Sequence, residues 1–291
     1  MIYSFMLGTA KIFQYPHLIR AGERLIPIDR NLVMGIINVT PDSFYGGSRY
    51  STQDMVRLQA QRMIEDGSDI LDIGACSTRP GSGETNAKTE KNRLDSALSV
   101  IRTDFPDILL SVDTYRSGIA DWAITEYNVQ IINDISGGNL DPDIYRVVGK
   151  HQVVYILMHM LGTPRIMQDN PVYKEVVGDI SLYFSEKINL LRDAGVTDIW
   201  LDPGFGFGKT IKHNYTLLNH LPDFLLFERP IVVGISRKSM IYKVLKGAPE
   251  SALNGTSILH TIALLKGAGI LRAHDVRQAR ECIQLVNLLT A

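Results

Sequence analysis

Residues 108–134 read ILLSVDTYRSGIADWAITEYNVQIIND, in which two short apolar runs flank a segment long enough for one helix. The first run ends at Asp113 and the second at Asn133. A continuous apolar run, unlike an alternating one, suits a strand covered on both faces, as the strands of a parallel sheet are. The stretch therefore predicts a strand, a helix and a second parallel strand.

Apolar runs of this kind recur along the chain, separated by segments that can each hold a helix. They lie at 32–39, 70–73, 108–112, 129–132, 153–158, 199–201, 231–235 and 269–271. Eight strands alternating with helices predict an α/β fold, a single (β/α)8 TIM barrel of about 250 residues. A doubly wound sheet would need fewer strands or a second domain, and no shift in composition marks a linker.

The barrel leaves the first thirty or so of the 291 residues over. We expect residues 1–30 to form an N-terminal extension and residues 31–291 to form the barrel. Within the extension, 10–17 and 24–28 can pair as a hairpin across Ala21-Gly22 and close the barrel floor.

Two helices have recognisable ends. Ser51 followed by Asp54 resembles a capping box, and Gly67 supplies a stop after a stripe formed by Met55, Leu58 and Met63. The last helix has Asp275 as its cap and apolar residues at spacings of three and four: Val276, Ala279, Ile283 and Val286.

Composition argues against several classes of partner. A formal net charge of -1 gives no reason to expect binding to nucleic acid or to an anionic membrane. No apolar run reaches 18 residues and no basic leader precedes the first apolar residues, so we expect a soluble, cytoplasmic protein. Cys76 and Cys282 are far apart in the sequence, which indicates reduced thiols rather than a disulfide framework or a zinc site.

The apolar runs end in polar residues. These are Asn38, Asp113, Asn133, His159, Asp202 and Arg272. In a barrel the carboxyl ends of the strands form the catalytic face, so these residues should share one pocket, although a single strand-end Asp or Asn is as often a helix cap or turn residue.

Positive charge follows three strands. SRKS at 236–239 and RAHD at 272–275 follow the seventh and eighth, and TRPG at 78–81 follows the second. Loops in these positions often bind phosphate, so an anionic substrate is expected; the alternative is ordinary solvated Arg and Lys. The amide oxygen of Asn38 could ligate Mg2+, with substrate phosphates and water completing the coordination shell of the ion. The alternative is that Asn38 is a turn residue, which is the more common role of a lone Asn.

The segment GFGFGK at 204–209 matches neither GxGxxG nor GxxxxGK[ST]. Phe207 within it can pack against a planar substrate or simply belong to the core.

Eight motifs together resemble those of the dihydropteroate synthase family, in the family's order. They are NVTPDSF at 38–44, STRPG at 77–81, SVDT at 111–114, NDI at 133–135, MHM at 158–160, LDPGFGFGK at 201–209, SRKS at 236–239 and RAHD at 272–275. The resemblance implies condensation of 6-hydroxymethyl-7,8-dihydropterin diphosphate with para-aminobenzoate, Mg2+ as cofactor, sensitivity to sulfonamides and a homodimer.

The resemblance also implies roles for individual residues. The pterin ring would be held by Asp113, Asn133, Asp202 and Lys238, in a slot lined by Met158, Phe207 and Gly234. Asn38 would meet Mg2+, and the diphosphate would be contacted by Thr78, Arg79, Arg272 and His274. The aromatic acid would lie under the segments around Asp42 and Thr78-Arg79-Pro80, with Ser239 near its carboxylate. Asp113 and Asp42 would stabilise a pterin methylene cation formed as diphosphate departs.

Two positions depart from the family pattern. Cys76 stands where the family usually has Glu, and Tyr45-Gly46-Gly47 appears one residue shorter than the usual Ser-Asp-Gly-Gly. Both lie in the amine-binding loops, so affinity for the aromatic acid is in question while pterin binding is not. Two alternatives stay open: a catalytically weak pterin-binding homologue, and a methyltransferase barrel that holds methyltetrahydrofolate.

Overall fold

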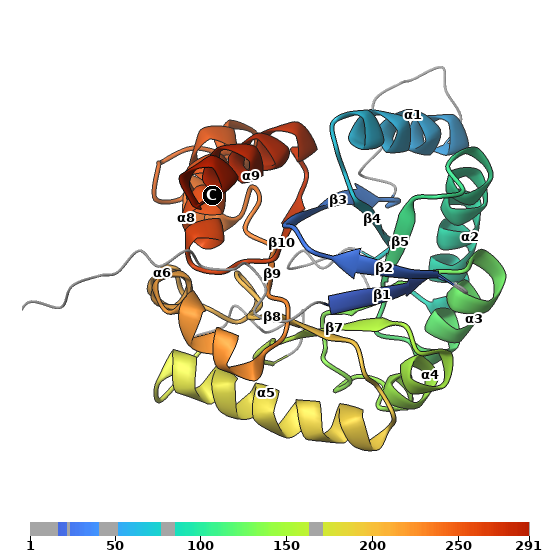
Figure 1. Cartoon of the computed structure of the whole chain (residues 1–291), viewed down its shortest axis with the longest axis horizontal. Coiled ribbons are helices and arrows are strands. Elements are labelled where there is room, and N and C mark those ends of the chain that lie inside the picture. The colour runs from blue at the N-terminus through green and yellow to red at the C-terminus, as the bar shows by residue number, and fades with distance from the viewer. Residues whose placement is uncertain (1–16, 22–23, 41–51, 77–84, 163–170, 291) are drawn as a thin grey trace, which may run out of the picture.

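The computed structural model describes residues 17–21, 24–40, 52–76, 85–162 and 171–290, which form a ring of parallel strands surrounded by helices (Figure 1). The strands are β3 (Leu32–Asn38), β4 (Ile70–Gly74), β5 (Leu109–Asp113), β6 (Ile131–Asp134), β7 (Val154–Met158), β8 (Ile199–Asp202), β9 (Val232–Val233) and β10 (Ile270–Ala273). They pair in the order β8-β7-β6-β5-β4-β3-β10-β9, and a parallel bridge between Leu201 and Ile231 brings the two ends of the sheet together. The predicted barrel is confirmed.

The seventh apolar run forms a shorter strand than predicted. Only Val232 and Val233 of 231–235 pair as strand residues, with β10 as their partner. The chain then turns, and the amide of Lys238 donates to the carbonyl of Ile235 at 3.1 Å. The turn takes Lys238 out of the sheet at the carboxyl end of the strand.

Helices cover the outer face of the ring (Figure 1). They are α1 (Thr52–Glu65), α2 (Ala87–Asp104), α3 (Ser117–Tyr127), α4 (Asp143–His151), α5 (Val176–Asp193), α6 (Ile211–Asn219), α7 (Ser239–Tyr242), α8 (Leu253–Leu265) and α9 (Val276–Thr290), with short 3-10 turns at Leu221–Phe227 and Pro249–Ser251. Their inward faces and the outward side chains of the strands form one continuous core. Among the described helices, none combines the length and apolar character needed to span a membrane.

The stripe predicted for α1 is partly wrong. Leu58 is 51% exposed, and the buried residues of this helix are Val56, Ala60 and Met63. The end at Gly67 is confirmed, since this glycine has a φ of +95°, a left-handed conformation that favours a residue without a side chain. Ser51, the expected cap, lies outside the described residues.

The last helix has the predicted buried face. Val276, Ala279, Ile283 and Val286 are all at most 3% exposed. The carboxylate of Asp275, expected to cap this helix, accepts two hydrogen bonds from Arg237.

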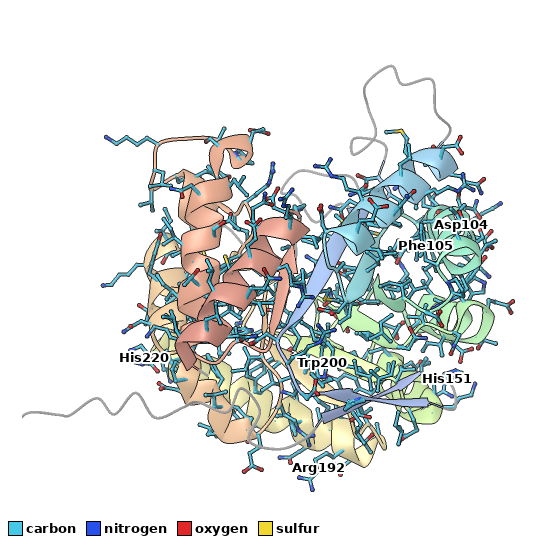
Figure 2. All side chains as sticks on the ribbon, turned by 45° about the horizontal axis from the view of Figure 1, so that its top comes forward. Asp104, Phe105, His151, Arg192, Trp200 and His220 are labelled. Carbon is cyan, nitrogen blue, oxygen red and sulfur yellow. The ribbon has the colours of Figure 1, made fainter. Side chains whose placement is uncertain are left out.

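A hairpin lies across the barrel floor, as predicted, but its first arm is placed differently. It is formed by β1 (His17–Ala21) and β2 (Arg24–Ile28), whereas 10–17 was expected and 10–16 lie outside the described residues. Ile19 and Ile28 are buried in a cluster with side chains from the amino ends of the strands, including Trp200. Figure 2 labels Trp200 inside the ring of helices, while Arg192 and His220 lie at its periphery.

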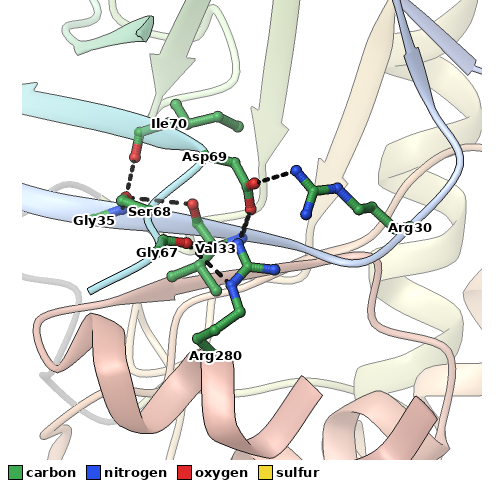
Figure 3. A network of polar contacts seen from close by, with 8 residues as sticks. All are labelled: Arg30, Val33, Gly35, Gly67, Ser68, Asp69, Ile70 and Arg280. Carbon is green, nitrogen blue, oxygen red and sulfur yellow. Dashed lines mark hydrogen bonds and ion pairs between the residues drawn. The ribbon is translucent and has the colours of Figure 1, made fainter. Parts of the chain in front are cut away.

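A polar network also fastens this end of the barrel (Figure 3). Arg280 of α9 donates to the carbonyl of Gly67 and pairs with Asp69, whose carboxylate also accepts from Arg30 and from the amide of Val33. Because the network joins the last helix to the first strands of the ring, it stabilises the barrel at the amino ends of these strands.

Candidate active site

Four polar or small residues lie at one level, at or next to the carboxyl ends of neighbouring strands. Asn38 of β3 lies opposite Gly74 of β4, Gly74 opposite Asp113 of β5, and Asp113 opposite Asn133 of β6. Residues in register on adjacent strands share one face of a sheet. The sheet therefore brings together the polar groups that the sequence scatters over nearly a hundred positions.

Arg272 joins two carboxylates at this level. Its Nη2 donates to Asp113 at 2.9 Å and its Nε to Asp72 at 2.7 Å. Asp72 is fully buried, and it also accepts from Ser111 Oγ at 2.6 Å and from Asn133 Nδ2 at 3.1 Å. Burial lowers the pKa of Arg272, but the two carboxylates outweigh it and raise the pKa above its ordinary value, so the guanidinium stays charged.

Asp72 was missed from the sequence. It is a charged residue inside the apolar run 70–73, where a lone carboxylate would be costly without partners. A charged residue inside an apolar run could have identified Asp72 as part of the site.

Asp113 sits where protonation is finely balanced. Burial raises the pKa of its carboxyl to about 7; the Arg272 guanidinium opposes this rise, and the carboxylate of Asp72 adds to it. An entering cationic group would favour the ionised form, whereas a neutral ligand would leave the balance unchanged.

Asp202 and Lys238 are two further residues of opposite charge in the mouth, and each affects the pKa of the other. Asp202 ends β8 at 6% exposure and accepts from the amide of Gly204 at 2.7 Å. Burial raises the pKa of Asp202, and the charge of Lys238 opposes that rise. Burial likewise lowers the pKa of Lys238 to about 8, which the charge of Asp202 opposes.

Gly234 lies between Asp202 and Arg272. A Cβ built on it would stand 3.9 Å from Asp202 Oδ2 and 3.9 Å from the Arg272 side chain. The glycine thus leaves open the space that separates the two charged side chains.

An apolar wall adjoins the charged groups. Met158, at the end of β7 and opposite Asp202 in register, packs with Ile135, Met160 and Phe207. Lys238 Nζ lies 4.5 Å from the centre of the Phe207 ring and donates to the carbonyl of Phe205. This combination of a flat apolar wall and convergent polar groups suits a planar heterocycle with hydrogen-bonding edges.

The basic loop after β9 is not uniformly free to bind anions. Arg237 donates to both carboxylate oxygens of Asp275, at 2.9 and 2.7 Å, so its charge is already engaged. Ser239 follows as the first residue of α7, half-buried.

His274 stands at the rim of the site. Its Nδ1 lies 3.2 Å from Ser236 Oγ. His274 is exposed to solvent, yet partial desolvation of the ring and the charges of Arg272 and Arg237 lower its pKa, which favours the neutral imidazole.

His159 was expected in the pocket as a strand-end residue. Its Nδ1 instead lies 3.0 Å from the buried ammonium of Lys209, and its ring meets the ring of Tyr183 edge-on. Burial lowers the pKa of His159 to about 3. It is a neutral partner of Lys209.

Cys76 ends the described part of the second loop. Its Sγ lies 3.9 Å from Arg116, and Arg116 pairs with the buried carboxylate of Glu90 and donates to the carbonyl of Thr85. Burial and the charge of Glu90 raise the pKa of Cys76 to about 12, so the thiol stays protonated. Arg116 and Glu90 were not identified from the sequence.

Asp42 and Tyr45 of the first loop, and Thr78, Arg79 and Pro80 of the second, lie outside the described residues.

The described residues fit a weakly held cation. No three His, Cys, Asp or Glu side chains gather as a metal cluster within the described ranges. Asn38 Oδ1 lies 3.2 Å from the point that a Cβ on Gly74 would occupy, with Asp113 Oδ2 3.8 Å from the same point. Because Gly74 has no side chain, the amide oxygen of Asn38 stays accessible beside the carboxylate of Asp113. An ion ligated mainly by water and phosphate would need such an accessible oxygen.

Comparison with known proteins points in one direction. Residues 34–274 match the family model described as pterin binding enzyme. The dihydropteroate synthase of Escherichia coli strain K12 is 37% identical over 285 residues, covering 97% of this chain and 94% of that protein.

Two crystal structures extend the likeness to the fold. The Yersinia pestis dihydropteroate synthase with a sulfonamide drug complex is 36% identical with a TM-score of 0.87, covering 94% of this chain and 99% of that one. The Xanthomonas albilineans enzyme with 4-aminobenzoic acid is 32% identical with a TM-score of 0.88, covering 95% and 99%.

Proposed function

The chain belongs to the pterin-binding enzyme family, and on that premise we propose that it is a dihydropteroate synthase, a transferase of the pterin-methyl group. It condenses 6-hydroxymethyl-7,8-dihydropterin diphosphate with para-aminobenzoate to give 7,8-dihydropteroate and diphosphate. The observation that carries the proposal is the convergence of charged groups at one end of the barrel: Arg272 pairs with Asp113, Gly234 leaves space between Arg272 and Asp202, and the charge of Asp202 acts on Lys238.

In this proposal the pterin ring lies in the barrel mouth. Asp202 and Asn133 meet the amino-pyrimidinone edge, Asp113 accepts from a ring N–H, and Lys238 donates to a ring acceptor. Each charge-assisted hydrogen bond is worth about 1.5–3 kcal/mol. Support comes from Phe207, which packs against the cluster that includes Met158 and also lies against Lys238, so that the flat ring has an apolar wall beside its polar partners.

Arg272 and His274 act on the diphosphate, together with Thr78 and Arg79. The C–O bond between the pterin methylene and the diphosphate breaks with its electron pair leaving on the diphosphate, and Arg272 stabilises the charge that develops there. His274, neutral in the free protein, contributes a hydrogen bond rather than a charge until the anion raises its pKa.

Amine attack completes the reaction. The lone pair of the para-aminobenzoate nitrogen forms the new C–N bond, and the nitrogen then loses a proton to solvent. Asp113 and Asp42 stabilise the positive charge on the pterin methylene, while Pro80 and Ser239 help to hold the aromatic acid. Sulfonamides, which share the arylamine shape, are expected to compete at this position.

Asn38 would hold Mg2+ through its amide oxygen, and the bound ion would supply charge neutralisation for the diphosphate. Chelation with EDTA is expected to abolish turnover and added Mg2+ to restore it. Full activity in EDTA would contradict this part of the proposal.

The proposal is tested with purified protein, pterin diphosphate, para-aminobenzoate and Mg2+. Release of diphosphate that depends on the aromatic amine supports a synthase. Pterin binding without turnover would identify a binding module instead.

We further propose one barrel domain over residues 31–291 with the extension 1–30, a cytoplasmic location and a homodimer. Leu285, Leu288 and Leu289 of α9 are 65%, 78% and 74% exposed, an apolar surface that a second copy could cover. Sedimentation should give a dimer, and Leu285→Arg combined with Leu288→Arg should shift it to a monomer.

A further inference from the structure

The loop after β8 has an unusual backbone. Gly204, Gly206 and Gly208 all have left-handed φ values, of +73°, +81° and +62°. A Cβ on Gly204 would lie 1.9 Å from the carbonyl oxygen of His159, so the loop touches the backbone that follows β7. In this arrangement several backbone carbonyl groups face one common position and do not pair with a neighbouring strand, so they need another donor.

Lys209 occupies that point. It is 3% exposed, and its Nζ donates to the carbonyls of Gly204 at 2.9 Å, Phe207 at 3.1 Å and His159 at 3.2 Å. A fourth neighbour, His159 Nδ1, lies at 3.0 Å. All four acceptors are neutral, so the ammonium is held by hydrogen bonds to uncharged groups and not by an ion pair with a carboxylate.

The clamped loop presents its other atoms to the candidate active site. The amide of Gly204 donates to Asp202, the carbonyl of Phe205 accepts from Lys238, and the ring of Phe207 lies against the same ammonium. Gly204 and Phe207 therefore serve both purposes: their carbonyls accept from Lys209, while the amide of Gly204 contacts Asp202 and the ring of Phe207 contacts Lys238.

The charge of Lys209 also acts on Asp202. Burial raises the pKa of Asp202, and Lys238, Arg272 and Lys209 all oppose that rise. Burial lowers the pKa of Lys209 itself, while the charge of Asp202 opposes the lowering. Lys209 therefore favours an ionised Asp202 while donating to none of its oxygens.

We propose that Lys209 is a positioning residue for pterin recognition, holding the 204–208 loop so that Asp202, Lys238 and Phe207 face the ring together. The inference rests on the proposed function for its ligand but concerns a residue outside the predicted site. Without the ammonium, three carbonyl oxygens would share one buried point with no donor, and the loop would open to solvate them.

The test is direct binding of 6-hydroxymethyl-7,8-dihydropterin by calorimetry, with KM for para-aminobenzoate measured separately. Lys209→Met keeps the length of the side chain and removes its donors and charge. It should weaken pterin binding by about tenfold or more while changing the KM for para-aminobenzoate by less than about threefold. Lys212→Met, an exposed lysine on α6, is the matched control and should bind pterin as the unchanged protein does.

Lys209→Gln restores part of the donor capacity without the charge, so it should recover part of the affinity. It also replaces Lys209→Met if that variant fails to fold. Thermal unfolding is recorded for each variant, because a purely structural role would lower the Tm without changing the pterin affinity of the folded protein.

Pterin affinity within about twofold of the unchanged protein, in a folded variant, would overturn the inference. So would equal losses for pterin and para-aminobenzoate. Because calorimetry needs no turnover, failure of the synthase assay with a retained effect of Lys209→Met would count against the proposed reaction and not against this role.

Discussion

The Nε of Arg272 donates to the carboxylate of Asp72 at 2.7 Å, although 200 positions separate the two residues in the chain. Asp72 has no exposed surface, and it also accepts hydrogen bonds from Ser111 and Asn133. Asp72 therefore fixes the direction of Arg272 and of Asn133 from beneath the site, while Asp113 holds the other side of the guanidinium.

Asp72→Asn should impair both stability and catalysis. Breaking a buried ion pair leaves Arg272 with an uncompensated charge on one side, so the free energy of unfolding should fall by about 3 kcal/mol. The kcat should fall by about tenfold or more, because Arg272 no longer keeps its direction. Urea unfolding and steady-state kinetics measure the two effects, with exposed Asp193→Asn as control; a kcat equal to that of the control would show that Asp72 does not position Arg272.

Lys238 should set an alkaline limit on pterin use. Its pKa is lowered to about 8, so the ammonium that donates to the ring is present below that pH and lost above it. The kcat/KM for pterin diphosphate, which reports the free enzyme, should fall as the pH rises through about 8. In Lys238→Arg this fall in kcat/KM should occur at a much higher pH, because arginine stays protonated. If the fall stays at the same pH, it reports the ionisation of another group.

Asp202→Ala and Thr78→Ala should separate the two substrates. Loss of the Asp202 carboxylate should abolish detectable pterin binding, since Lys238 would lose its buried counter-charge. Thr78→Ala should leave binding of the pterin ring unchanged, because Thr78 is assigned to the diphosphate and not to the ring, and it should mainly raise the KM for para-aminobenzoate, which the segment 78–80 is proposed to cover. Isothermal calorimetry with the pterin alone distinguishes them, and unchanged affinity in Asp202→Ala would mean that the ring is held elsewhere.

Ile19→Ala should destabilise the fold without affecting ligands. Ile19 is fully buried in the floor cluster, so its truncation should cost about 2–5 kcal/mol of unfolding free energy. Leu18→Ala, on the 43% exposed neighbouring side chain, should cost about 0.5 kcal/mol or less. Pterin affinity should match in both variants; a loss confined to Ile19→Ala would show that the floor is coupled to the catalytic face.

Local patterns were enough for the barrel and for much of the site. Largely apolar runs located the eight barrel strands, because a strand buried on both faces must be apolar along most of its length. Asp113, Asn133, Asp202 and Arg272 could be named because each ends such a run, and a barrel gathers those ends at one face. The same reasoning gave only approximate limits for the hairpin and for β9, where short segments carry little periodic signal.

What the sequence by itself determined is the order of the elements, the buried face of α9 and the strand-end residues of the mouth, since these follow from spacing along the chain. Only the tertiary structure decided that Leu58 is exposed, that Arg237 is neutralised by Asp275, and that Asp72 and Lys209 support the site from behind. Each of these outcomes depends on which side chain a distant segment brings within hydrogen-bonding distance, and closure of the ring is what sets those distances.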